Sequence, residues 1–88
     1  MKTYLFYRSR TEDESAIRDF LQSLKTIGDD EHVIMQDVNT RDASERARLY
    51  DIMVFPTLLT TTNDGVQVQV WTQNMPTLGE IIYYLKQL

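Results

Sequence analysis

The sequence predicts an α/β fold, a mixed four-stranded sheet in the order β-α-β-α-β-β-α with helices on both faces. Three observations lead to this prediction. Two β-prone apolar runs in the first half of the chain are each followed by a segment of helical character. The tripeptide Asn-Asp-Gly at 63–65 separates two further β-prone runs, which is typical of a hairpin. The composition, 42% hydrophobic and 25% charged, is that of a globular domain.

The first strand is expected at 3–8, because its continuous apolar centre suits a strand that is buried on both faces. A helix is expected next. Thr11 and Glu14 have the spacing of a capping box that would open this helix, and Gly28 is suited to end it. Apolar residues at the spacing of one helical face lie between them, at Ile17, Phe20, Leu21 and Leu24.

The second strand is expected at 32–38, and a short helix follows it to about Tyr50. Asp42 and Glu45 form a second capping-type pair at the start of this helix. The side of the helix that faces the core would be formed by Ala43, Ala47 and Tyr50. Because a helix connects the first two strands, we expect them to be parallel, with a right-handed crossover.

The third strand is expected at 56–61 and the fourth at 66–71. In the fourth strand, valines alternate with glutamines, so Val66, Val68 and Val70 should face one way. Thr77 and Glu80 form a third capping box, which would open the last helix. The apolar stripe of this helix would consist of Leu78, Ile81, Ile82 and Leu85.

Composition argues against several classes of function. The chain of 88 residues, read as a single domain over 1–88, has no cysteine and one histidine, which excludes disulfides, thiolate metal sites, cysteine nucleophiles and histidine-pair metal sites. A net charge of −4 without a basic cluster argues against a nucleic-acid partner. Neither a membrane span nor a signal-peptide core is present, so we expect a cytoplasmic protein without a membrane partner.

The segment from Asp37 to Trp71 resembles the thioredoxin superfamily, in particular its minimal, glutaredoxin-sized members, and the resemblance extends over nearly the whole chain. Members of this family typically have a short helix ending in Tyr-Gly-Ile, then Pro-Thr-Leu and a glycine hairpin. The residues that match are Tyr50, Ile52, Pro56, Thr57, Leu58 and Gly65, whereas Asp51 stands where glycine is usual. The resemblance implies that the Phe55–Pro56 peptide bond is cis.

The chain departs from this family at the redox motif. The resemblance places Cys-x-x-Cys at the start of the first helix, where this sequence has Thr11 and Glu14 or, in the neighbouring register, Glu12 and Ser15. Dithiol–disulfide exchange requires a thiolate that attacks sulfur, and neither register supplies one. The resemblance therefore implies the fold without the redox activity, and we predict no catalytic residue, cofactor or metal.

The resemblance also implies a binding groove where the first strand ends, the third begins and the fourth ends. The candidate residues of this groove are Arg8, Arg10, Thr11, Glu12, Val54, Phe55, Pro56, Thr57, Gln73, Asn74 and Met75. The acids at 12–14 are better interpreted as partners of the helix dipole than as a cation site. Likewise, because three acids lie next to them, we favour local pairing or solvation of Arg8 and Arg10 over an anion site.

Our first hypothesis is a non-catalytic binding or adaptor module, which takes a protein or peptide partner through the cis-proline groove. A second is an enzyme that uses glutathione or another small anion without a cysteine of its own. A third is a regulator that resembles KaiB, a thioredoxin-related family that shares the Pro-Thr-Leu stretch. The Asn-Asp-Gly hairpin and the alternating fourth strand favour an ordinary thioredoxin ending over this third alternative.

Overall fold

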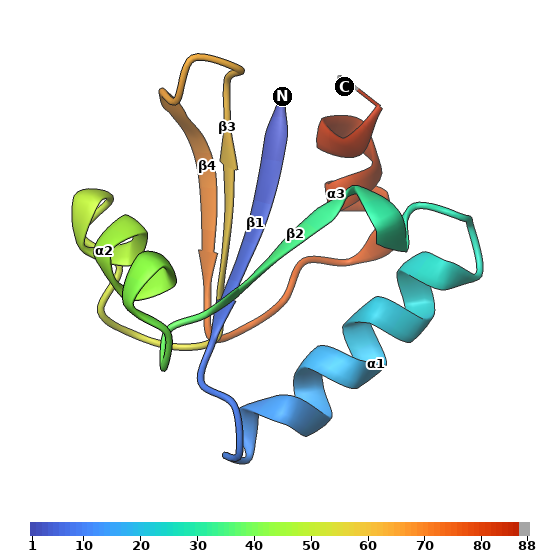
Figure 1. The fold of residues 1–88 in the computed structure, drawn as a ribbon. Coiled ribbons are helices and arrows are strands. Elements are labelled where there is room, and N and C mark those ends of the chain that lie inside the picture. Colours follow the sequence, from blue (N-terminus) through green and yellow to red (C-terminus); the bar gives the residue numbers. More distant parts are fainter. Residues whose placement is uncertain (87–88) are drawn as a thin grey trace.

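In the computed structural model, which describes residues 1–86, the strands form one sheet in the spatial order β2-β1-β3-β4 (Figure 1). The strands are β1 (Lys2–Tyr7), β2 (Val33–Asp37), β3 (Thr57–Thr61) and β4 (Gln67–Thr72). β1 pairs with β2 in parallel and with β3 in antiparallel orientation, and β3 and β4 are antiparallel. The predicted mixed four-stranded sheet and its order of elements are confirmed.

Helices cover both faces of the sheet, also as predicted. Figure 1 shows α1 (Asp13–Lys25) and α3 (Leu78–Leu85) on one side of the strands and α2 (Arg41–Leu49) on the other. A short 3-10 turn at Asp30–His32 leads into β2. α1 ends before Gly28, whose φ of 76° is a backbone conformation that glycine adopts without steric cost.

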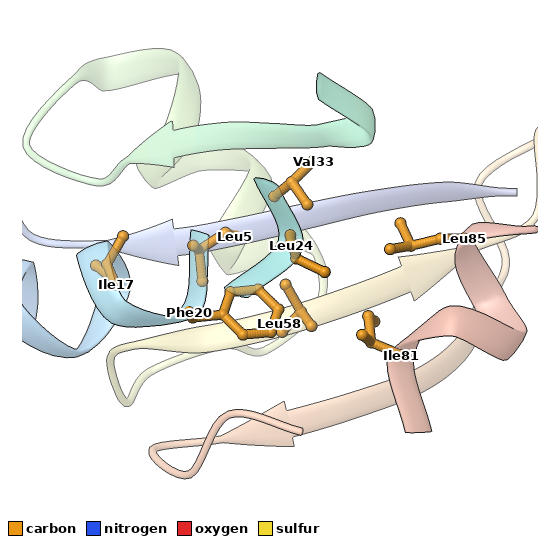
Figure 2. Packing of buried hydrophobic residues seen from close by; sticks show 8 residues of the cluster. All are labelled: Leu5, Ile17, Phe20, Leu24, Val33, Leu58, Ile81 and Leu85. Carbon is orange, nitrogen blue, oxygen red and sulfur yellow. The ribbon is translucent and has the colours of Figure 1, made fainter. Parts of the chain in front are cut away.

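The larger part of the core lies between the sheet and the pair α1 and α3. Figure 2 shows this cluster, which consists of Leu5, Ile17, Phe20, Leu24, Val33, Leu58, Ile81 and Leu85. Leu5 and Leu58 are paired neighbours on the two central strands and are fully buried. Burial of each such side chain stabilises the fold by roughly 1.5–3 kcal/mol, so this layer holds α1 and α3 on the sheet.

The core on the α2 side is smaller. Its buried residues are Tyr4, Phe6, Ala47, Ile52 and Leu59. Two of the residues predicted for the inner side of this helix, Ala43 and Ala47, are buried, whereas Tyr50 is half-buried and its hydroxyl donates to the Gly65 carbonyl at 2.7 Å. Because alanine is small, α2 fills little space above the sheet, which leaves hollows beside this helix.

The capping predictions have mixed outcomes. At α3 both halves of the predicted box form, between Thr77 and Glu80. At α1 the box is wrong: the N-cap is Glu12, and the carboxylate of Glu14 accepts from the Arg10 N–H at 3.0 Å. Arg10 has a φ of 62°, and this left-handed conformation presents its N–H, in place of the Thr11 N–H, to that carboxylate.

The capping pair predicted for α2 is also wrong. The N-cap of this helix is Thr40, without a side-chain hydrogen bond, so Asp42 lies inside the first turn. Glu45 bonds one turn back to Arg41, at 3.1 Å between Nε and Oε1. The helix therefore starts two residues before the position that the Asp-x-x-Glu spacing indicates.

β4 interrupts the predicted alternation. Thr60 pairs with Gln69 and Thr61 pairs with Gln67, so Val68 is an extra residue that forms a β-bulge. Val70 packs against the α2-side core, whereas Val66 is 60% and Val68 is 40% exposed. The prediction that the three valines share one face is therefore wrong across the bulge.

We expect Thr77→Ala to lower the free energy of unfolding by about 1 kcal/mol, because the Glu80 N–H at the start of α3 loses its acceptor. Urea unfolding followed by circular dichroism measures this change. Thr77→Ser keeps the hydroxyl and should stay close to the parent protein. Equal destabilisation by the two substitutions would show that the methyl group of Thr77, and not the cap, stabilises the helix.

Candidate binding groove at the ends of the strands

Three segments that are distant in sequence meet at one end of the sheet. Figure 1 shows the loop after β1, the loop before β3 and the segment after β4 at the same end. The Gln73 N–H donates to the Pro56 carbonyl at 2.8 Å, which joins the last two of these segments. The guanidinium carbon of Arg8 lies 5.8 Å from the centre of the Phe55 ring, which joins the first two.

The loop before β3 presents apolar side chains to solvent. The Phe55–Pro56 peptide bond is cis, and Pro56 and Thr57 are buried where β3 begins. The Thr57 hydroxyl donates to the Val54 carbonyl at 2.6 Å, which fixes the shape of the loop. Met53 is 85% and Val54 is 42% exposed, whereas Phe55 is half-buried and packs against the α2-side core.

The segment after β1 is held by local bonds. Arg8 Nε lies 3.2 Å from Oδ2 of Asp13, a buried carboxylate in the first turn of α1. The Thr11 hydroxyl donates to the Arg8 carbonyl at 2.8 Å and accepts from the Asp13 N–H at 3.2 Å. Glu12 is exposed at the N-cap. Pairing of Arg8 with a neighbouring acid is thus what the structure shows, and Arg8 links the start of α1 to Phe55.

The segment after β4 faces a different direction from the loop before β3. Gln73, with a φ of 66°, turns the chain, and the Asn74 N–H donates to the Thr72 carbonyl at 2.8 Å. Met75 packs against the core between the sheet and α1. Gln73, Asn74 and Met75 line a hollow that also includes residues of α1, among them Ala16 and Phe20. The predicted groove residues therefore do not share one hollow: Gln73, Asn74 and Met75 line this one, Phe55 lines a second, and Val54 and Thr57 line a third. The linings of these three hollows do not include Arg8, Arg10, Thr11, Glu12 and Pro56.

The second hollow lies between α2 and the loop before β3, and we call it the α2 groove. Its volume is about 370 Å³, and its lining consists of Val38, Ser44, Ala47, Arg48, Asp51, Ile52, Met53 and Phe55. Of the predicted site residues, Phe55 is the one that lines it. A smaller hollow on the far side of the same loop, of about 250 Å³, is lined in part by Val54, Thr57, Val70 and Thr72.

Sequence reasoning missed most of the α2 groove. Val38 and Ala47 have the appearance of ordinary core residues, and Arg48 that of a solvated helix residue. The sequence signal that points to the groove is the run Met53-Val54-Phe55, apolar residues in a loop where polar residues are common, and Val54 and Phe55 are among the predicted groove residues.

The edge beside the groove carries a carboxylate that is held in its charged form. Hydrogen bonds from Ser9 and from the Asn39 N–H keep the pKa of Asp37 below its ordinary value, and the charge of Arg10 adds to this effect. The Ser9 and Asn39 N–H groups lie 3.2 and 3.0 Å from Oδ1 of Asp37. Burial, together with the charges of Asp37 and Glu14, raises the pKa of the Tyr7 hydroxyl.

We expect Asp37→Asn to flatten the loss of stability in acid. A carboxyl with a lowered pKa in the folded state stabilises the protein above its unfolded value, near 3.9, and this stabilisation is lost as the pH falls through the folded pKa. Unfolding midpoints in urea between about pH 5 and pH 3 measure the slope. Asp19→Asn, on the outer surface of α1, removes the same charge and is the control. Parallel slopes in Asp37→Asn and the parent would contradict the prediction.

A scan against protein-family models finds no match, and a search of curated proteins finds none either. Solved structures give a match to thioredoxin 1 from the thermophilic eubacterium Thermosipho africanus TCF52B. The TM-score is 0.65 at 16% sequence identity, over 99% of this chain and 92% of that one. This chain has the thioredoxin fold.

Within the thioredoxin fold, the chain lacks the chemistry of thiol–disulfide exchange. The sequence contains no cysteine, so no thiolate is available to attack a disulfide. Among residues 1–86, no group of histidine, aspartate and glutamate side chains is arranged to hold a metal ion. No helix in the same range is long and apolar enough to cross a membrane.

Proposed function

We propose that this chain is a redox-inactive thioredoxin-like module that binds an extended protein or peptide segment at the α2 groove and the loop before β3. The observation that carries the proposal is the exposure of Met53 and Val54 between two hollows. Exposed apolar side chains that border a concave surface are typical of interaction sites. A partner segment across this loop would bury them.

The backbone of the loop supports an extended partner. No hydrogen bond of the Phe55 N–H or carbonyl occurs within residues 1–86. A partner strand that pairs with these two groups would satisfy them by β-augmentation. Backbone pairing tolerates many sequences, so selectivity would come from the side chains that flank Phe55.

Those flanking side chains indicate the chemistry of the partner. Val38, Ala47 and Ile52 offer an apolar surface for one anchoring side chain. Met53 is unbranched and adapts to different anchors. Arg48 lines the same groove without an ion pair inside the described chain, and Arg8 lies over Phe55. We therefore propose an apolar anchor next to an acidic residue, which these guanidinium groups attract.

The other two functions lack such support. An anion-using enzyme would need several cationic side chains around one anion, and Arg48 is the one cation in the lining of the α2 groove. For the KaiB-like alternative, no feature of residues 1–86 provides a specific argument. We therefore keep the binding module as the one proposed function.

The proposal is tested by selecting linear peptides from a random displayed library against the full chain and mapping a selected peptide by amide chemical shifts. We expect the largest shifts at 53–57 and along Arg48–Ile52. A failure to enrich any peptide would contradict the proposal. Shifts confined to the outer face of Arg41–Arg48, to Gln73–Met75, or to Tyr83 and Tyr84 would place the interface elsewhere.

A further inference from the structure

β4 is an edge strand without the charges or proline that commonly protect such strands against pairing with another chain. Nine residues, Gly65 to Gln73, carry no charge and no proline, and most of them are β-prone. Val68 on this strand and Val66, just before it, are substantially exposed. Edge strands of natural proteins commonly carry charges or proline, because unpaired backbone groups are a template for a further strand.

Gln69 supplies a protection of a different kind. Its side-chain Oε1 accepts a hydrogen bond from the Val70 N–H at 2.9 Å. The Gln73 N–H bonds Pro56 beside β3, and N–H groups along a strand point alternately to either side. The Val70 N–H therefore points to the free edge. There it already donates to Oε1 of Gln69, so it is not available to the carbonyl of another strand.

The opposite edge of the sheet has the same arrangement. On β2, Nε2 of Gln36 donates to the Met35 carbonyl at 3.0 Å. The Val38 N–H bonds the Tyr7 carbonyl, so by alternation Met35 presents its carbonyl to the outer side of β2. On each free edge, a glutamine side chain thus forms a hydrogen bond with an outward-pointing backbone group. On β4 the bulge at Val68 also distorts the edge.

We propose that Gln69 keeps the β4 edge closed against pairing with a second copy of this chain. An antiparallel pairing about a two-fold axis at Val70 uses the same edge of both copies, as an isologous interface requires. Two chains of net charge −4 repel each other, but the uncharged edge from Gly65 to Gln73 brings no like charges face to face. A second copy is therefore a partner that fits this edge once Gln69 is removed.

Sedimentation velocity of the full chain over a wide concentration range tests the proposal. We expect the parent protein to be a monomer and Gln69→Val to form a dimer. The matched control is Gln67→Val, which makes the same substitution on the same strand but keeps the hydrogen bond from the Val70 N–H to Gln69. We expect Gln69→Val to dimerise about tenfold more tightly than Gln67→Val. Gln69→Thr is too short to close the edge and should also dimerise.

The location of the contact has its own measurement. In the Gln69→Val dimer, the Val70 amide should exchange with solvent more slowly than in the monomer of the same variant. Three results would overturn the proposal: equal association of the Gln67 and Gln69 variants, a monomeric state of both Gln69 variants, and a dimer in which exchange at Val70 is unchanged. A parent protein that already dimerises through β4 would overturn it as well.

Discussion

Leu58→Ala is expected to lower the free energy of unfolding by about 2–5 kcal/mol, as truncation of a fully buried leucine does. Leu58 is fully buried on the central strand β3, and it belongs to the cluster that holds α1 and α3 on the sheet (Figure 2). Removal of its branched end leaves a cavity among rigid elements that cannot collapse around it. A domain of this size is stable by roughly 5–15 kcal/mol, so the loss is a large share of the total.

The matched control is Leu49→Ala in the last turn of α2, where the leucine side chain is 76% exposed. The two substitutions remove the same atoms, and the exposed one should change stability by no more than about 0.5 kcal/mol. Urea unfolding, followed by the fluorescence of Trp71 and by circular dichroism, measures both. Similar losses at the two positions would show that the layer between the sheet and α1 is not the main source of stability.

Periodicity and turn chemistry predict most of the fold. Apolar spacing identifies the inner faces of α1 and α3, because a helix must place residues such as Ile17 and Leu24 on one side. Gly65, with a φ of 95°, lies in the hairpin where the Asn-Asp-Gly signal indicates a turn. Helix faces and tight turns are determined by residues that are close in sequence, so the sequence alone is sufficient to predict them.

Caps and bulges depend on neighbours that local spacing does not reveal. The same Thr-x-x-Glu spacing occurs at Thr11 and Thr77, but only Thr77 forms the box. The difference lies in Arg10, whose left-handed backbone redirects the bonds of the first turn of α1. In β4, the alternation of valine and glutamine is disrupted at Val68, which has no partner in β3. No property of residues 66–71 alone requires this bulge.

The candidate site was also predictable only in part, because the directions of its side chains depend on tertiary contacts. Resemblance brought together the three segments that meet at the ends of the strands, and Arg8, Phe55 and Gln73 show this meeting. It did not indicate that Gln73 and Met75 turn towards α1 while Phe55 turns towards α2. The division follows from the left-handed backbone of Gln73, with a φ of 66°, and from the packing of Phe55 and Met75 against different core clusters.

Met53→Asp is expected to weaken binding of a selected peptide by about 10–100-fold, in the range of a central interface residue. Met53 borders both the α2 groove and the smaller hollow beyond the loop, so a partner that crosses the loop covers it. A carboxylate there would have to lose water against an apolar surface, and it would repel the acidic residue proposed for the partner. Titration calorimetry measures the affinity.

The effect is separable from folding, because the Met53 side chain is 85% exposed and belongs to neither core cluster. Its substitution should change stability by no more than about 0.5 kcal/mol. Met53→Leu keeps an apolar side chain and should retain the affinity. Met35→Asp adds the same charge on the α1 side of the sheet and should also bind normally. If Met53→Asp bound as tightly as the parent, the exposed methionine would lie outside the interface, and the α2 groove would lose its main support as the binding site.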